Sequence, residues 1–327
     1  MLRHFLFHRK NNYPLSNHFD GKKFFNPHAK EKFPYFRLLK WLIKRKEAKW
    51  PKWVQNHYPC QLPTHLKEKE IAVTFINHAS FLIQTANLNI LIDPIYSKRI
   101  SPSALIGPKR VRLPGIPFKL LPPVDLILIT HNHYDHLDIP TLKRLKKTHN
   151  PLFISGLGNK KILKSHGFRQ VIELDWWEKY HYRSSEITFV PAQHFSSRSP
   201  FDRNQTLWGG FMVEILGKKI YHMGDSGYGP HFQEIQKTLG SPDVSLLSIG
   251  SYKPRWFMKK MHINPEEAVQ AHLELDSQLT IPMHFGTFPL SDEPFEQPLV
   301  NLEASIKKHR ITKIKVLDFG ETVLIPN

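Results

Sequence analysis

The sequence predicts a layered α/β fold, because short apolar strands recur along most of the chain and helical segments lie between some of them. The strand candidates are 71–76, 80–86, 88–93, 124–130, 151–156, 186–192, 210–216, 219–225, 244–250, 279–285 and 315–321. The run at 124–130 is apolar almost throughout, which is typical of a strand buried on both faces. The clearest helix start is Asn264, because Pro265 follows this N-cap candidate and Glu267 stands three residues after it.

Length and composition are those of a globular protein with one large domain or two modest ones. The chain has 327 residues, of which 40% are hydrophobic and 23% are charged. It contains no apolar run of the roughly 18 residues that a transmembrane helix needs, and the apolar stretch near Met1 is too short for a signal peptide. Cys60 is the single cysteine, so no disulfide can form within the chain. We therefore expect a cytoplasmic protein.

The formal net charge of +18 favours anionic partners, whether nucleic acid, an anionic lipid surface or a phosphorylated substrate. Much of the excess lies near the N-terminus, and we divide the chain into a basic N-terminal arm, 1–65, and a catalytic domain, 66–327. In the arm, apolar residues at helical spacing predict a short amphipathic helix: Phe36, Leu39, Leu42 and Ile43. Such a helix either touches a membrane or packs on the main domain, and we favour packing.

The segment THNHYDHLD at 130–138 concentrates metal-binding side chains directly after a buried strand. In an extended segment His131 and His133 point the same way, so both can reach one ion. The following turn then aims Asp135 and His136 at a neighbouring point. Imidazole nitrogen and carboxylate oxygen suit zinc, and two adjacent ions can clamp a hydroxide nucleophile and an anionic transition state together.

Three more candidates stand where apolar runs end, which is where catalytic groups collect in α/β sheets: His194, Asp225 and His284. Taken alone, each is more often an ordinary polar residue than a ligand. Together with the first motif, they are candidates to complete two metal sites.

This pattern resembles the metallo-β-lactamase superfamily, and within it the N-acyl-phosphatidylethanolamine-hydrolysing phospholipases D, from about Gly21 to the C-terminus. The motifs that carry the resemblance are DPIYSKRISPS (93–103), GPKRVR (107–112), LPPVD (121–125), HNHYDHLD (131–138), IELDWWE (172–178), GDSGY (224–228), YKPRWFM (252–258), HINPEEAV (262–269) and HFGTF (284–288). Ser226 stands where the family has Thr, and Phe285 where Trp is common. The polar segment 195–205 does not match closely, which leaves the acyl-chain preference open.

The resemblance implies a four-layer αββα sandwich with two Zn²⁺ ions, although iron or manganese can occupy such sites. The implied ligands of the first zinc are His131, His133 and His194, and those of the second are Asp135, His136 and His284. Asp225 is implied to bridge the two ions, and a water acidified by both would attack phosphorus. The implied catalytic residues are Asp135, Asp225 and His262, the last as a phosphate contact or an outer partner of the ligands.

Several residues keep two interpretations. Asp93 either supports a metal-binding histidine or forms a turn with Pro94, and His78 either faces the cleft or serves a turn. For the aromatic residues Trp176, Trp177, Trp256 and Phe257 we favour core or rim packing over contact with acyl chains.

The expected function is hydrolysis of N-acyl-phosphatidylethanolamine to N-acylethanolamine and phosphatidic acid by a zinc-dependent phosphodiesterase. The expected partners are the phospholipid and an anionic membrane surface, touched peripherally at the inner face, with no nucleic acid; an oligomer stays open. The alternatives are a lactonase or phosphodiesterase acting on a small phosphorylated metabolite, an RNA-processing nuclease, and a basic interaction protein that has lost catalysis.

Overall fold

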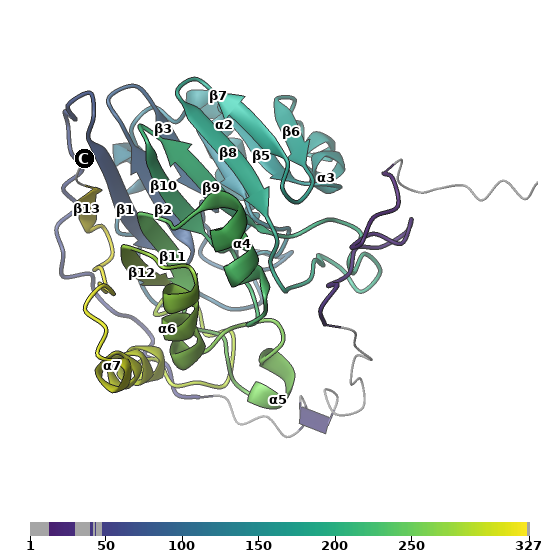
Figure 1. The fold of residues 1–327 in the computed structure, drawn as a ribbon, viewed down its shortest axis with the longest axis vertical. Helices are drawn as coiled ribbons and strands as arrows, with labels where there is room; N and C mark the ends of the chain where they lie inside the picture. Colours follow the sequence, from purple (N-terminus) through teal and green to yellow (C-terminus); the bar gives the residue numbers. More distant parts are fainter. Residues whose placement is uncertain (1–12, 30–39, 42, 44–47, 326–327) are drawn as a thin grey trace, which may run out of the picture.

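The computed structural model describes residues 13–29, 40, 41, 43 and 48–325. Its framework consists of two mixed β-sheets that face each other (Figure 1). The first sheet has seven strands in the order β13-β1-β2-β3-β4-β5-β6. Their bounds are β1 Ile71–Asn77, β2 Ser80–Gln84, β3 Asn89–Ile92, β4 Leu126–Ile129, β5 Leu152–Gly156, β6 Val171–Leu174 and β13 Thr322–Ile325.

The second sheet has six strands in the order β12-β11-β10-β9-β8-β7. Their bounds are β7 Lys179–Tyr182, β8 Ser185–Val190, β9 Gly210–Ile215, β10 Lys218–His222, β11 Val244–Ser248 and β12 Leu279–Met283. Each sheet joins an antiparallel part to a parallel part: β3 to β6 run parallel in the first sheet, and β10 to β12 in the second.

Helices cover the outer faces of the sheets. Buried side chains of α2 (Ile139–His149) and α3 (Asn159–Ser165) pack on the first sheet, and those of α4 (His231–Leu239) and α6 (Pro265–Glu274) belong to the core of the second. The last long helix, α7 (Gln297–His309), packs against α6. Short helical turns occur at Phe118–Leu120 and at α5, Arg255–Met258. The expectation of a four-layer αββα sandwich is confirmed.

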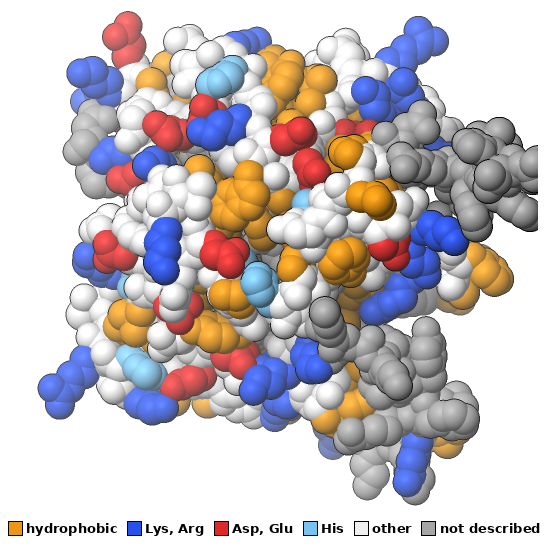
Figure 2. Space-filling model, turned by 45° about the vertical axis from the view of Figure 1, so that its right-hand side comes forward, with side chains coloured by type: hydrophobic (Ala, Val, Ile, Leu, Met, Phe, Trp, Pro, Cys, Tyr) orange, Lys and Arg blue, Asp and Glu red, His pale blue; other side chains and the backbone are white. Residues whose placement is uncertain are grey.

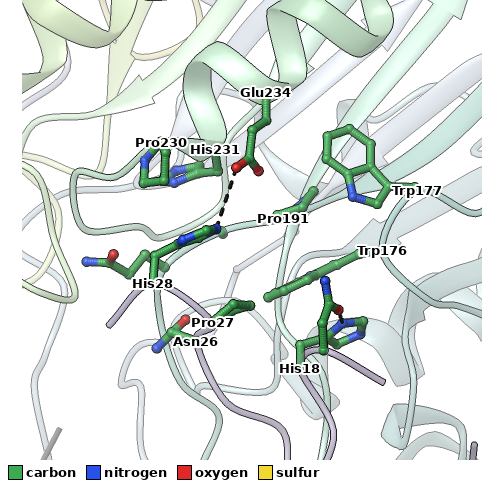
Figure 3. Close-up of a pocket in the computed structure, with 13 residues that line it drawn as sticks. His18, Asn26, Pro27, His28, Trp176, Trp177, Pro191, Pro230, His231 and Glu234 are labelled. Atoms are coloured by element: carbon green, nitrogen blue, oxygen red, sulfur yellow. Dashed lines mark hydrogen bonds and ion pairs between the residues drawn. The ribbon is translucent and has the colours of Figure 1, made fainter. Parts of the chain in front are cut away.

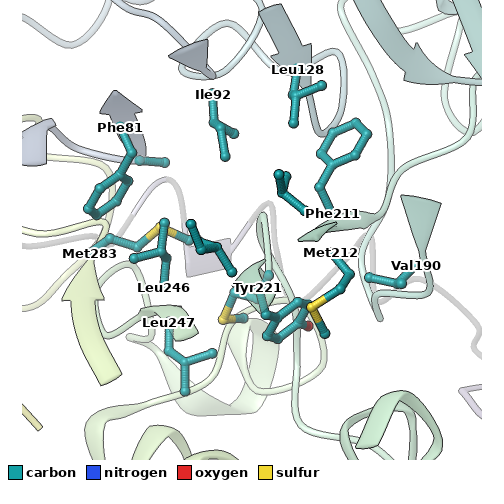
Figure 4. Close-up of a cluster of buried hydrophobic side chains, with 14 of the residues drawn as sticks. Phe81, Ile92, Leu128, Val190, Phe211, Met212, Tyr221, Leu246, Leu247 and Met283 are labelled. Carbon is teal, nitrogen blue, oxygen red and sulfur yellow. The ribbon is translucent and has the colours of Figure 1, made fainter. Parts of the chain in front are cut away.

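Side-chain alternation explains how the inner strands are buried on both faces. In β4, Leu126 and Leu128 belong to the cluster between the sheets, whereas Ile127 and Ile129 belong to the cluster under α2 and α3. Figure 4 shows Leu128 across the central layer from residues of the second sheet such as Leu246 and Phe211. With core on both sides, the ends of these strands are held firmly, and the loops that follow them start from fixed points.

The structure corrects one predicted strand and adds two. Residues 315–321 do not form a strand, because the chain turns at Phe319 and Gly320, and the strand that pairs with β1 runs from Thr322 to Ile325. Leu317 and Phe319 are buried, but as side chains of a loop. β6 and β7 were not among the predicted strands. In β7 the side chains alternate between exposed and half-buried at the edge of the sheet, so no apolar run marks it.

The predicted amphipathic helix of the arm lies largely outside the described residues, since Phe36, Leu39 and Leu42 are among those not described. Of the arm's tryptophans, Trp41 donates from Nε1 to Asp292 Oδ2 at 2.7 Å, and Trp50 donates to the Glu293 carbonyl at 3.0 Å. None of the described helices is both long enough and apolar enough to cross a lipid bilayer.

Candidate metal centre

The first cluster of potential ligands joins the loop after β4 to two strand ends of the opposite sheet. His131 Nε2 lies 2.9 Å from His133 Nδ1, and His194 Nε2 lies 3.2 Å from the same His133 atom. Asp225 follows β10, and its Oδ2 lies 3.8 Å from Nε2 of both His131 and His194. One potential ligand atom from each residue lies within 4.8 Å of the others, so the four can hold one metal ion.

The second cluster stands beside the first and again combines the two sheets. Asp135 Oδ2 lies 3.5 Å from His284 Nε2 and 3.7 Å from His136 Nε2. His78, in the turn between β1 and β2, adds its Nε2 at 3.1 Å from the same oxygen. These four residues also form a group that could hold a metal ion.

Asp225 lies between the two clusters. Its Oδ2 is 3.2 Å from His136 Nε2, in addition to its approach to the first cluster, and its Oδ1 is 3.2 Å from His284 Nε2. A single carboxylate therefore faces both groups of imidazoles, which is the arrangement expected of a ligand shared by two ions.

The turn predicted within 130–138 is what separates the two sets of ligands. The backbone N–H groups of His136 and Leu137 both donate to the His133 carbonyl, at 3.1 and 2.8 Å. This tight turn follows the extended His131–His133 segment and brings Asp135 and His136 round to the second cluster.

Asp93 supports this loop from behind. Its Oδ2 accepts from Thr130 Oγ1 at 2.6 Å and lies 2.7 Å from His136 Nδ1, and its Oδ1 accepts from the Thr130 N–H at 2.9 Å. An imidazole whose Nδ1 is fixed by a carboxylate presents Nε2 in a set direction, which is the usual outer partner of a metal-binding histidine. Asp93 also has a φ of 43°, so the turn and the support that the sequence left as alternatives occur together.

His284 is held in place by a close backbone approach. It has a φ of 64°, which is uncommon for a residue other than glycine, and its N–H donates to the His78 carbonyl at 2.7 Å. Gly250 makes this conformation possible, because a Cβ there would lie 1.9 Å from the His284 carbonyl oxygen. The second cluster therefore depends on a glycine at the end of β11.

Burial and the clustered charges set the protonation states of the metal-free centre. Burial lowers the pKa of His131 and His194 well below the ordinary value. Burial would raise the pKa of Asp225, but His284 and His136 outweigh it and hold that pKa well below its usual range. Burial likewise lowers the pKa of His284, but Asp225 and Asp135 reverse the effect and raise it to about 9. Ionised carboxylates and neutral imidazoles are the forms that bind metals, and a proton on His284 supplies positive charge that a cation would otherwise supply.

The clusters fit metal ions better than a network of hydrogen bonds. Four buried polar atoms at their centre lack a hydrogen-bond partner: His136 Nε2, His262 Nδ1, His284 Nε2 and Asp225 Oδ1. Buried polar groups without partners are costly and rare in proteins, whereas these donor atoms face one another at distances that a cation between them would satisfy.

The structure brings together all eight residues proposed from the sequence. His262, which precedes α6, lies with its Nδ1 3.9 Å from Asp225 Oδ2 and forms a third potential group with Asp225 and His284. His78, for which the sequence left two interpretations, lies in the second cluster. Trp176 is buried and donates to the Trp208 carbonyl at 2.7 Å, whereas Trp256 is exposed.

Comparison with known proteins places this centre in a family. A family profile described as the Beta-lactamase superfamily domain matches residues 88–285, which contain all eight residues proposed from the sequence but not His78. The chain belongs to the metallo-β-lactamase superfamily. Its two His/Asp clusters could each hold a metal ion. A protein of Methanopyrus kandleri that is described as a metal-dependent hydrolase is 29% identical over 257 residues, covering 76% of this chain and 98% of that protein.

Relatives within the superfamily agree with this assignment. An uncharacterized protein of Mycobacterium tuberculosis is 37% identical over 247 residues, covering 74% of this chain and 66% of that protein, slightly less than two thirds of its length. The N-acyl-phosphatidylethanolamine-hydrolyzing phospholipase D 1 of Caenorhabditis elegans is 33% identical over 269 residues, covering 78% of this chain and 76% of the relative. The crystal structure of a possible metal-dependent hydrolase from Veillonella parvula has the same fold, with a TM-score of 0.64 at 17% identity over 77% of this chain and 98% of that one.

Proposed function

We propose that this superfamily member is a zinc-dependent phosphodiesterase that hydrolyses N-acyl-phosphatidylethanolamine to N-acylethanolamine and phosphatidic acid. The observation that carries the proposal is the pair of adjacent clusters that share Asp225. Two cations held side by side suit a phosphodiester, since this substrate places charge on two oxygens in its transition state. The similarity to the Caenorhabditis elegans phospholipase D supports the choice of lipid.

The ligand roles follow the clusters. In this proposal His131, His133 and His194 hold one zinc ion, and Asp135, His136 and His284 hold the other, with Asp225 between them. When bound, the two ions lower the pKa of water and neutralise charge on the phosphoryl oxygens. Catalysis then needs no nucleophilic side chain from the protein.

The chain's own residues then orient the reactants. Asp135 and Asp225 remain ionised because the neighbouring imidazoles hold the pKa of each carboxyl well below its usual range, even though burial alone would raise it. His262 is not needed to complete either four-residue cluster, and its unpartnered Nδ1 points into the centre. We assign to it a hydrogen bond to the phosphate of the substrate.

The composition of the segments around the centre supports peripheral binding of the protein to an anionic membrane surface. Among these segments, two loops and α5 carry an exposed apolar side chain: Leu105, Phe201 and Trp256. The same segments contain basic residues, among them Arg203 and Lys259. Figure 2 shows Lys and Arg side chains on one face of the molecule together with apolar and acidic ones. Such a surface can meet anionic lipid without a membrane-spanning segment.

The test is an assay of zinc-loaded protein with N-acyl-phosphatidylethanolamine in mixed micelles and in anionic or neutral vesicles. We expect phosphatidic acid and N-acylethanolamine in equal amounts, with faster release and stronger sedimentation on the anionic vesicles. A soluble phosphodiester, bis(p-nitrophenyl) phosphate, serves as the control substrate. Hydrolysis of the control without release of phosphatidic acid would show that the lipid assignment is wrong. If neither substrate is hydrolysed, the proposed phosphodiesterase activity is wrong.

A further inference from the structure

A side chain of the N-terminal arm is bonded to the backbone of a potential metal ligand. The Asn26 amide donates from Nδ2 to the His194 carbonyl at 2.8 Å, and Asn26 Oδ1 accepts from the His194 N–H at 3.2 Å. The two residues are 168 positions apart in the sequence. We infer that Asn26 is a positioning residue that fixes His194 for binding the metal of the first cluster, so that the arm contributes to the metal affinity of the centre.

The Asn26 side chain provides the backbone hydrogen bonds that the sheet does not provide at His194. β8 ends at Val190, and beyond it the described chain continues the pairing on this side only through an isolated bridge between Gln193 and Gly227. His194 is buried, so its backbone N–H and C=O groups need partners from the protein. The side-chain amide of Asn26 satisfies both groups, in the way that a neighbouring strand would.

The ring of His194 has little remaining freedom once its backbone is held. Its Nδ1 donates to the Met261 carbonyl at 2.9 Å, which leaves Nε2 directed toward His133 and Asp225. Three hydrogen bonds therefore set the position of this ligand, and two of them come from one residue of the arm. Partners of this kind preorganise a ligand and contribute to metal affinity.

The arm is itself firmly docked, so Asn26 is attached to a fixed base. Phe19 and Phe24 are buried in the main core. His18 stacks on Trp176 with ring centroids 4.3 Å apart and lies 2.7 Å from Asp175. Figure 3 shows Asn26, Pro27 and His28 of the arm on one side of a small cavity of about 90 Å³, with Trp176 and Pro191 of the domain opposite.

The arm also reaches the loop that follows His194. The Phe24 N–H donates to the Asn204 carbonyl at 2.9 Å, and the Asn204 N–H donates to the Ser196 carbonyl at 2.8 Å. From the same loop, the Ser197 N–H donates at 2.9 Å to the side chain of Asn132, which stands between two ligands of the first cluster. A second line of contacts thus joins the arm to the same cluster.

The test compares Asn26→Ala with Asn17→Ala, an identical truncation in the same arm whose side chain bonds to the neighbouring His18. Titration of the metal-free proteins with Zn²⁺, and with Co²⁺ as a spectroscopic probe, measures the affinity of each site. For Asn26→Ala we expect affinity at one of the two sites to fall by about 10- to 100-fold, with an altered Co²⁺ absorption band, while the other site stays unchanged. Asn17→Ala should bind both ions as the wild type does.

The variant Asn26→Asp keeps the acceptor for the His194 N–H and loses the donor, so its affinity should lie between those of the wild type and Asn26→Ala. Wild-type affinity and spectrum in Asn26→Ala would overturn the inference. If Asn26→Ala fails to fold, Asn26→Asp decides, and unchanged binding in that variant would likewise overturn it. The readouts use no substrate, so they are independent of whether the lipid assignment is correct.

Discussion

At the scale of single residues, Asp225 has an unusual environment. Five histidine nitrogens lie within 3.9 Å of its carboxylate oxygens, from His131, His136, His194, His262 and His284. A buried carboxylate is unfavourable without positive charge nearby, and without metal the proton on His284 supplies part of that charge. Because its two oxygens face histidine nitrogens of both clusters, we regard Asp225 as shared between two metal sites, where two cations would supply the charge.

Asp225→Asn is the sharpest test of that interpretation. The amide keeps the size of the side chain but carries no charge, so both sites lose an anionic ligand at once. We expect metal affinity to fall more than 100-fold, beyond the loss that follows from removing an outer partner of a ligand. Metal content by elemental analysis measures this, with the partly exposed carboxylate of Asp243 changed to Asn as the charge-matched control. If Asp225→Asn still binds two ions tightly, Asp225 is not a ligand shared by the two sites.

The sequence predicted these ligands because local rules place them. Alternation in an extended segment, a turn after it and the ends of buried strands account for His131, His136 and His284 alike. Asn26 was not predicted, because no spacing or motif marks an asparagine whose partner His194 lies 168 positions away in the sequence. His78 stayed ambiguous for the same reason, since its place beside Asp135 depends on the order of the strands within the first sheet, which the local sequence does not show.

At the scale of elements, the N-terminus of α6 connects helix stability to the site. The Asn264 side chain accepts from the Glu267 N–H at 2.8 Å, and Glu267 Oε2 accepts from the Asn264 N–H at 3.0 Å, which is the predicted capping box. The same carboxylate accepts two hydrogen bonds from Arg255, at 2.7 and 2.8 Å, and Arg255 also donates to the His262 carbonyl at 2.9 Å. The cap therefore also holds the residue that we assign to the phosphate.

Asn264→Ala should lower the free energy of unfolding by about 1 kcal/mol, the usual cost of losing an N-cap. It should also reduce turnover by displacing His262, while leaving the metal content unchanged. Thermal denaturation, elemental analysis and steady-state kinetics measure the three quantities. Asn264→Asp, which retains the acceptor, is the control and should behave like the wild type; equal stability of the Ala and Asp variants would show that the cap contributes nothing.

Elements that the sequence misjudged share a physical cause. Leu317 and Phe319 look like strand residues because they are apolar, yet their burial comes from packing a turn onto the core. β7 has no apolar run, and it is a strand because its backbone pairs with β8 from Lys179 to Tyr182. Local composition reports burial, whereas pairing at a sheet edge depends on a neighbour that the local sequence does not show.

At the scale of the whole molecule, the metal centre joins the two sheets. The first sheet supplies His131 and His133 to one cluster and Asp135 and His136 to the other, all from the loop after β4. The second sheet supplies His194, His284 and the shared Asp225, which follow β8, β12 and β10. An ion in either cluster therefore has ligands from both sheets. Unfolding separates the sheets and must break the bonds between the ion and its ligands.

Removal of the metal should consequently lower the thermal stability of the entire domain. A ligand that binds only the folded state at 100 times its Kd contributes about 2.7 kcal/mol, which corresponds to an increase in Tm of about 4–5 °C for a domain of this size. We expect this difference between zinc-saturated and chelator-treated protein, with a single cooperative transition in each case. In Asp225→Asn the same zinc concentration should shift Tm much less, because neither cluster can then link the sheets strongly. An equal Tm with and without zinc would mean that the ions, if they bind, do not hold the two layers together.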